Sequence, residues 1–222
     1  MIPFINICNG LDNWNALTNG SLTRSASNSI MGPTIEFDLS SIPALDSSDE
    51  PVNVYVGYNN TYLFLIMIQK SKDIESRYTT ELSGVISDMA FAMASSRIGG
   101  IIDVTHSTML PNQITNAEAI IRTNDFGDAA DRLGVMNDNS YGPILFEVPK
   151  SIFLVPGNRK ALFGVKTVKI KRSNVLTFDL IIENWTNGQE ANKIYLDASK
   201  SCPPYAPIGN YGLYTHLGYD LS

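Results

Sequence analysis

Histidine is the side chain best suited to acid–base chemistry near neutral pH, and the chain has two, His106 and His216. Around the first of them, Asp103, His106 and Ser107 suggest a hydrolytic triad. A regular strand would point Asp103 and His106 to opposite faces, so this carboxylate could not orient the imidazole. Base catalysis by His106 with a partner distant in sequence and a purely structural His106 both stay open.

Carboxylate and amide oxygens concentrate in segment 125–138, which raises the question of a calcium site. The spacing is not that of an EF-hand loop, and Asp125, Asp128 and Asp131 also fit the start and exposed face of a helix. Residues 125–127 read Asp-Phe-Gly and segment 157–167 approaches a phosphate loop, but both lack the surrounding motifs that such sites need. The main prediction is therefore a protein without a metal, cofactor or catalytic residue.

Four basic residues are predicted interaction residues: Lys166, Lys169, Lys171 and Arg172. They stand in a chain of formal charge −6, so they favour docking on an acidic partner or on the acidic surface of another copy. The alternative is an edge strand whose lysines oppose aggregation. Nucleic-acid binding is not expected, because the chain is acidic and the basic strand has no interleaved aromatic residues.

The C-terminal segment supplies four further predicted interaction residues, interleaved with Pro, Gly and Asn: Tyr205, Tyr211, Tyr214 and Tyr219. Tyrosine offers a flat contact area at low entropic cost. These rings suit a sugar, a neighbouring subunit or the protein's own core, and the sequence leaves the three roles open.

The strongest signal for the elements that position these residues is segment 53–69, NVYVGYNNTYLFLIMIQ. Asn59 and Asn60 separate two strand-forming runs, which predicts a β-hairpin with a two-residue turn and Val56 opposite Leu63. The second strand is apolar on both faces, so it should lie centrally in its sheet, with both faces covered.

Apolar residues recur at steps of three and four in segment 73–97, which predicts one long amphipathic helix as a cover, weakened by Gly84. Segment 161–185 predicts a second hairpin, with a loop of three or five residues. Thr115 and Glu118 have capping-box spacing, and Asp125 can cap another helix, so two short helices are expected within 116–134. The predicted fold is a single α+β domain, β-rich, with a largely antiparallel sheet or sandwich.

Residues 52–64, VNVYVGYNNTYLF, resemble a strand pair of the ribosome-inactivating N-glycosidases, in which a base-stacking tyrosine stands where this chain has Tyr58. The resemblance covers this strand pair alone. It implies a Glu and an Arg about one turn apart on a helix, to stabilise an oxocarbenium-like transition state. The predicted helix has residues 87–91, SDMAF, instead, so we assign neither this activity nor this family.

The first ten residues, MIPFINICNG, carry no basic leader, and no apolar run is long enough to span a bilayer as a helix. We expect synthesis in the cytoplasm, with incorporation into a virus particle as one destination. Cys8 and Cys202 are then expected to be separate thiols, with a disulfide between them as the alternative.

The main functional prediction is a non-enzymatic structural or assembly protein, such as a virion component or another homo-oligomeric shell. It depends on the β-rich core, the sparse catalytic residues and the basic and tyrosine-rich segments. One alternative is a carbohydrate-binding β-sandwich, which requires an exposed cluster of Tyr and Asn beside a groove. The other is a hydrolase, which requires a pocket that converges on His106 or on segment 125–138.

Overall fold

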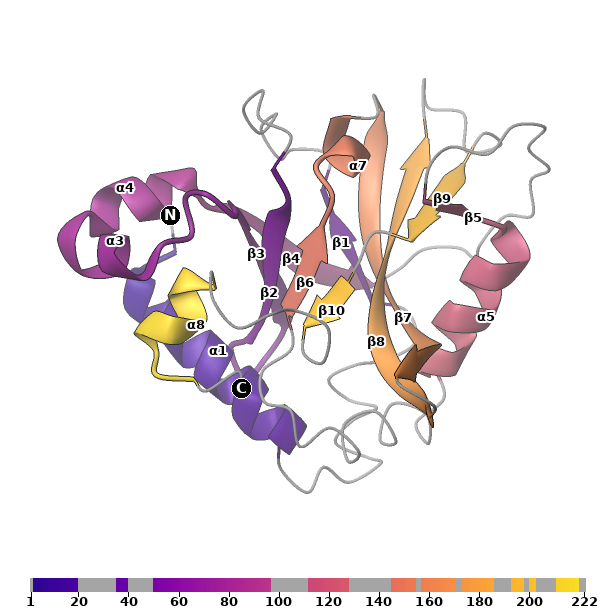
Figure 1. The fold of residues 1–222 in the computed structure, drawn as a ribbon, viewed down its shortest axis with the longest axis horizontal. Helices are drawn as coiled ribbons and strands as arrows, with labels where there is room; N and C mark the ends of the chain where they lie inside the picture. The colour runs from indigo at the N-terminus through magenta and orange to yellow at the C-terminus, as the bar shows by residue number, and fades with distance from the viewer. Residues whose placement is uncertain are drawn as a thin grey trace.

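The structure is a computed structural model, and it describes residues 2–19, 35–39, 50–96, 112–127, 145–154, 157–170, 173–185, 193–197, 200–202 and 211–219. Within these ranges, ten strands form one sheet in the order β10-β6-β2-β3-β4-β1-β7-β8-β9-β5, and neighbouring strands are antiparallel. The strands are β1 (Ile35–Asp38), β2 (Val52–Tyr58), β3 (Leu63–Gln69), β4 (Ala90–Ser96), β5 (Gln113–Ile114), β6 (Leu145–Val148), β7 (Asn158–Ile170), β8 (Ser173–Trp185), β9 (Ile194–Asp197) and β10 (Lys200–Cys202). The predicted β-rich, largely antiparallel α+β fold is confirmed in this form: one sheet, curved so that β10 comes next to β8 (Figure 1).

Six helices accompany the sheet in the described part of the chain: α1 (Phe4–Asn19), α3 (Glu75–Thr80), α4 (Leu82–Asp88), α5 (Asn116–Gly127), α7 (Ser151–Leu154) and α8 (Gly212–His216). In Figure 1, α1, α3, α4 and α8 gather beside the β2–β3 end of the molecule, and α5 lies at the other end, along β7 and β8. None of the helices within the described ranges combines the length and the apolar character that a membrane-spanning helix needs.

Each face of the β2–β3 pair is apolar and covered. Val54 and Leu65 belong to a core enclosed between the two halves of the curved sheet, together with Phe163 and Leu180 of β7 and β8. The opposite face belongs to a second core that α1, α3, α4 and α8 complete. All seven residues of β3 are buried, and β3 lies between β2 and β4, so the prediction of a central strand buried on both faces is confirmed.

The register of this hairpin differs from the prediction. Val56 lies opposite Leu65 rather than Leu63, so four residues, 59–62, form the turn instead of two. A shift by two residues keeps every side chain on its predicted face, because side chains alternate along a strand. The longer turn is stabilised by the side chain of Asn59, whose Oδ1 accepts the backbone N–H groups of Thr61 and Tyr62.

The prediction of one long helix over 73–97 is wrong. The chain forms two short helices, α3 and α4, with a non-helical φ of −136° at Glu81 between them, and then strand β4. Pairing with β3 decides the outcome, because Phe91 and Met93 of β4 align with Ile66 and Phe64 and satisfy their backbone groups in the sheet. Residues 87–91, compared above with an N-glycosidase helix, therefore belong to the end of α4 and the start of β4.

Two further local predictions have mixed outcomes. The helix at 116 is confirmed as α5, and Thr115 caps it by accepting the N–H of Glu118 at 3.1 Å. Asp125 lies within α5 and does not start a second helix there, and residues 128–134 lie outside the described residues.

The β7–β8 pairing continues to Ile170 and Ser173, so two residues separate the strands. The predicted loop of three or five residues is therefore wrong.

Candidate functional site

A cleft of about 480 Å³ separates α1 from the β2–β3 turn. We call it the amide cleft, because five of the residues that line it are asparagines of the helix and the turn, and three of the five are exposed. Its lining consists of Ile2, Pro3, Asn6, Asn9, Gly10, Asn13, Asn59, Asn60, Tyr62 and Phe64. Among these described residues none is charged, and the volume lies within the range of small-molecule sites.

Helix α1 builds one wall. Ile7, Leu11 and Trp14 recur at helical spacing and are buried, which fixes the helix against the sheet. Asn6, Asn9 and Asn13 also recur at steps of three and four, so the adjoining face of α1 presents a row of carboxamides. The inner member, Asn13, donates through Nδ2 to the carbonyl of Tyr58 at 3.1 Å and ties the helix to β2.

The two outer amides of this row are exposed. The side chains of Asn6 and Asn9 have no hydrogen-bond partner among the described residues. Each carboxamide therefore offers an oxygen acceptor and an NH₂ donor to whatever enters the cleft.

The β2–β3 turn builds the other wall. Asn59 holds the turn through the two hydrogen bonds at 3.0 and 2.9 Å to the N–H groups of Thr61 and Tyr62. Asn60 has a φ of 71°, a left-handed conformation that asparagine adopts more readily than most residues. The turn leaves the side chain of Tyr62 39% exposed at the cleft, so a flat aromatic surface faces the solvent there.

Phe64 forms the apolar floor of the cleft. The tip of its ring lies so close to α1 and β2 that a Cβ on Gly10 or on Gly57 would stand 2.4 Å from its Cζ. Both glycines are therefore required for this close packing. The floor is rigid because Phe64 is almost completely buried between two elements.

The groups that line the amide cleft can hold a ligand through hydrogen bonds and ring contacts. Its described lining contains hydrogen-bond donors and acceptors, one exposed aromatic ring and an apolar floor. Among those residues there is neither a carboxylate, an imidazole nor a thiol to act as acid, base or nucleophile. A neutral ligand rich in hydroxyl groups matches these properties.

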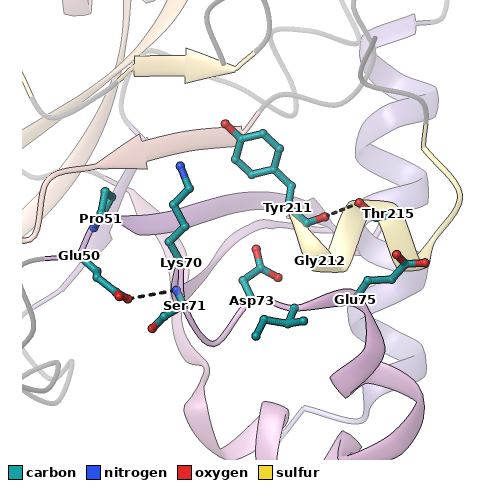
Figure 2. Close-up of a pocket in the computed structure, with 10 residues that line it drawn as sticks. Glu50, Pro51, Lys70, Ser71, Asp73, Glu75, Tyr211, Gly212 and Thr215 are labelled. Carbon is teal, nitrogen blue, oxygen red and sulfur yellow. Dashed lines mark hydrogen bonds between the residues drawn. The ribbon is translucent and has the colours of Figure 1, made fainter. Parts of the chain in front are cut away.

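A second cleft, of about 640 Å³, lies beside α8 and the turn after β3 (Figure 2). Asp73 lies at its base and is 1% exposed. Its carboxylate accepts hydrogen bonds from Asn53 Nδ2 at 2.7 Å, from the Tyr55 hydroxyl, from the Tyr78 hydroxyl at 2.7 Å and from the Leu213 N–H at 3.0 Å.

The buried carboxylate of Asp73 has a structural role. Burial raises the pKa of Asp73 above its ordinary value, and its four hydrogen bonds act against that increase. Burial also raises the pKa of Tyr55 and of Tyr78, and the neighbouring Asp73 adds to both increases. The carboxylate is surrounded by donors from β2, α3 and α8, so it joins these elements and leaves little acceptor capacity for a ligand.

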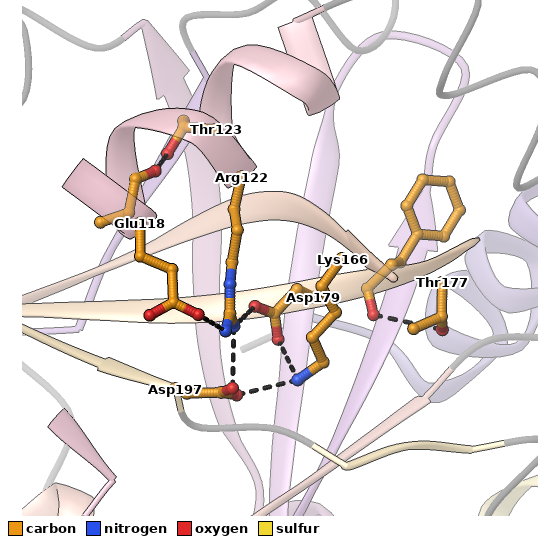
Figure 3. A network of polar contacts seen from close by, with 9 residues as sticks. Glu118, Arg122, Thr123, Lys166, Thr177, Asp179 and Asp197 are labelled. Carbon is orange, nitrogen blue, oxygen red and sulfur yellow. Dashed lines mark hydrogen bonds and ion pairs between the residues drawn. The ribbon is translucent and has the colours of Figure 1, made fainter. Parts of the chain in front are cut away.

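A third polar cluster joins α5 to the sheet (Figure 3). Arg122 Nη1 lies 2.6 Å from Asp179 and 2.8 Å from Asp197, and Lys166 Nζ contacts the same two carboxylates at 2.8 and 2.9 Å. Glu118 contacts Arg122 from the exposed side of α5. Burial acts to raise the pKa of Asp197, but Lys166 and Arg122 overcome this and hold the pKa below its ordinary value.

The structure places the predicted basic interaction residues as follows. Lys166 belongs to this internal cluster and is 15% exposed in its side chain, so its charge is neutralised within the molecule. Lys169 lies on β7 opposite Asn174. Lys171 and Arg172 lie outside the described residues, so their predicted role in docking stays a prediction.

The tyrosines of the C-terminal segment pack inward. Tyr211 and Tyr214 are buried in the core next to β2 and β3, and the Tyr214 ring meets that of Tyr55 edge-on at 4.7 Å. Tyr219 is half-buried and donates its hydroxyl hydrogen bond to Asp12 of α1. Of the three roles left open for these rings, the described ones perform the third, covering the protein's own core. Tyr205 lies outside the described residues.

The other residues singled out in the sequence are the predicted catalytic and calcium-binding residues, His216 and Cys8. Asp103, His106 and Ser107 lie outside the described residues, as do Asp128 and Asp131, so the hydrolase and calcium hypotheses stay untested. His216 stacks on Tyr78 with a ring-centre distance of 5.5 Å. Cys8 carries a free thiol.

Sequence reasoning missed the amide cleft because it missed α1. The available signal was the helical spacing of Ile7, Leu11 and Trp14, with Asn6 and Asn9 one step to the side.

No family model, no curated protein and no solved structure matches this chain.

Proposed function

We propose that the protein is a carbohydrate-binding module and that the amide cleft is its binding site. One observation carries the proposal: the amides of Asn6 and Asn9, which have no hydrogen-bond partner among the residues that the structure describes, face a groove whose other wall exposes Tyr62. A sugar site needs such an exposed group of Tyr and Asn side chains beside a groove.

The physical chemistry of sugars fits both walls. A sugar hydroxyl both donates and accepts hydrogen bonds, and a carboxamide does the same through neighbouring atoms. The C–H faces of a pyranose ring are apolar and pack on an aromatic ring, which is why tyrosine serves well where a ligand is half apolar and half wet. The apolar floor at Phe64 excludes water beneath the ligand.

The assembly hypothesis is less well supported by the described residues. Lys166 is neutralised by Asp179 and Asp197, and Tyr211 and Tyr214 are buried in the core. These three side chains would have to leave internal partners before they could contact another copy. A virion or shell component therefore stays the second hypothesis, without a specific contact to support it.

The test is a binding survey by titration calorimetry, with uncharged oligosaccharides of gluco, manno, galacto and N-acetylgluco configuration and with acidic glycans that carry a carboxylate or a sulfate. We expect at least one to bind, and we expect Tyr62→Ala and Asn9→Ala each to weaken it about tenfold, the loss of one stacking or hydrogen-bonding group. Tyr62→Phe should retain most of the affinity, because the ring remains.

Asn124→Ala is the matched control, because Asn124 is exposed on α5, outside the amide cleft. Binding that survives Tyr62→Ala and Asn9→Ala unchanged, or a complete lack of binding across neutral and acidic glycans, would overturn the proposal.

A further inference from the structure

The amide cleft also constrains the charge of its ligand. We infer that it selects uncharged pyranosides and rejects sugars that carry a carboxylate or a sulfate, an inference that rests on the proposed carbohydrate function.

The first argument is the lack of a counter-charge in the described lining. A sugar carboxylate that enters the cleft loses part of its hydration, and none of the described residues that line the cleft supplies an ammonium or guanidinium group to replace it. Amide NH₂ groups donate hydrogen bonds to a carboxylate but do not neutralise its charge.

The second argument is the sign of the charge that α1 carries. Asp12 is the one charged residue within α1, and it stands one helical turn from Asn9. It is exposed, and its carboxylate accepts the hydrogen bond of Tyr219. Together with a formal charge of −6 on the whole chain, this position repels an anionic ligand that approaches the α1 wall.

The third argument is the geometry of the polar groups. Asn6 and Asn9 lie at i and i+3 on the helix, so their amides stand next to each other along one wall. Each pairs with two neighbouring hydroxyls, accepting from one and donating to the other. Tyr62 supports the ring face from the turn, and Asn59 acts as its positioning residue, since its Oδ1 fixes the backbone of Thr61 and Tyr62.

The experiment compares a matched pair of ligands on the full-length protein. The neutral oligosaccharide that binds best in the survey is oxidised at its primary alcohols to the corresponding uronate, which changes charge and keeps the ring configuration. We expect the uronate to bind about tenfold or more weakly than the neutral sugar. The difference should shrink at high salt, because screening reduces the repulsion from Asp12.

A gain-of-function variant tests the location. Asn9→Lys places a cation in the α1 wall, so it should reduce the difference in affinity between the uronate and the neutral sugar several-fold. Asn124→Lys adds the same charge on α5, away from the cleft, and should leave that difference unchanged.

The outcomes separate the two proposals. Equal or tighter binding of the uronate, or a survey in which acidic glycans alone bind, would overturn the charge selectivity and leave a carbohydrate-binding protein. An equal response of the affinity difference to Asn9→Lys and Asn124→Lys would overturn the assignment to this cleft. A lack of binding to every glycan would overturn the proposed function, and the selectivity with it.

Discussion

Asp73 is a buried residue whose hydrogen-bond partners come from distant parts of the fold. Its carboxylate accepts hydrogen bonds from Asn53, Tyr55, Tyr78 and the backbone N–H of Leu213. These four residues belong to three elements, so one side chain joins all three. Asn6 and Asn9 represent the opposite case, since they are exposed polar groups without partners among the described residues. Satisfied polar groups stabilise the fold, and unsatisfied exposed ones are available to a ligand.

Replacing Asp73 by Asn tests the structural assignment. The substitution keeps the size but turns one acceptor into an NH₂ group that faces donors, so the free energy of unfolding should fall by roughly 1–3 kcal/mol. Denaturant titration at neutral pH measures this. Glu75→Gln, an exposed change two residues away, should cost less than about 0.5 kcal/mol. Equal stabilities of the two variants would contradict the structural role.

At the scale of elements, α8 shows how a short helix can be fixed by distant parts of the chain. Gly212 begins the helix, and a Cβ there would stand 2.6 Å from the carbonyl oxygen of Asp73 and 2.6 Å from the carbonyl carbon of Ile74. Backbone atoms cannot move aside as a flexible side chain can. The helix is therefore docked by close backbone approach as well as by Tyr214.

Gly212→Ala should accordingly loosen α8. We expect a loss of roughly 1–3 kcal/mol, as for overpacking in a core, and faster hydrogen exchange of the Leu213 amide, which bonds to Asp73. Gly84→Ala is the control, because a Cβ there meets Arg77 Nη2 at an ordinary 3.5 Å and replaces a helical glycine, which should stabilise α4 by about 0.5–1 kcal/mol. Unchanged exchange at Leu213 would contradict the docking.

The cluster of Arg122, Lys166, Asp179 and Asp197 connects α5 to β7, β8 and β9. Lys166→Met should lower the free energy of unfolding by roughly 1–3 kcal/mol at pH 7, less than for an isolated buried pair because Arg122 still contacts both carboxylates. Lys72→Met, which removes a more exposed pair with Asp88, should cost less than about 1 kcal/mol.

The pH dependence of the Lys166→Met variant has a definite sign. The folded-state pKa of Asp197 lies below its ordinary 3.8, so the ion pairs contribute stability above that pH and lose it as the pH falls below it. The difference in the free energy of unfolding between the wild type and Lys166→Met should therefore decrease as the pH falls into the acid range. A difference that stays constant from pH 7 to the acid range would contradict the contribution of this ion pair.

The sequence predicted the elements whose signals are local. The apolar run of β3 predicted a central strand, and all seven residues of that strand are buried. Thr115 predicted the start of α5, because its side chain accepts a hydrogen bond from the N–H of Glu118. Segment 73–97 was misjudged because its helical periodicity competed with a strand pairing to β3. The contact between Asp73 and Leu213 joins residues 140 positions apart, and no local pattern reveals it.

The candidate site was predictable only in outline. Asn59 and Asn60 were recognised as a turn, but Asn6 and Asn9 become one wall of a cleft only when α1 is known to be a helix against β2. Tyr211 and Tyr214 were predicted as interaction residues, with packing on the protein's own core as one of three roles, and the structure buries both in the core.

At the scale of the whole molecule, a curved sheet supports helices at two ends (Figure 1). The amide cleft lies between α1 and the β2–β3 turn. The second cleft, beside Asp73, is the nearest structural competitor for a ligand, because it is larger and includes the carboxylates of Glu50 and Glu75. We therefore expect a neutral sugar to bind at the amide cleft and not at the cleft beside Asp73.

The most direct test is an NMR titration of the ¹⁵N-labelled protein with the best-binding neutral oligosaccharide, following the side-chain NH₂ signals of asparagine. The account predicts that the signals of Asn6, Asn9, Asn59 and Asn60 shift together and saturate with one affinity, whereas those of Asn124 on α5 and Asn53 beside Asp73 stay in place. Shifts that centre on Asn53 and the backbone amides of residues 211–215, with Asn6 and Asn9 unchanged, would contradict it.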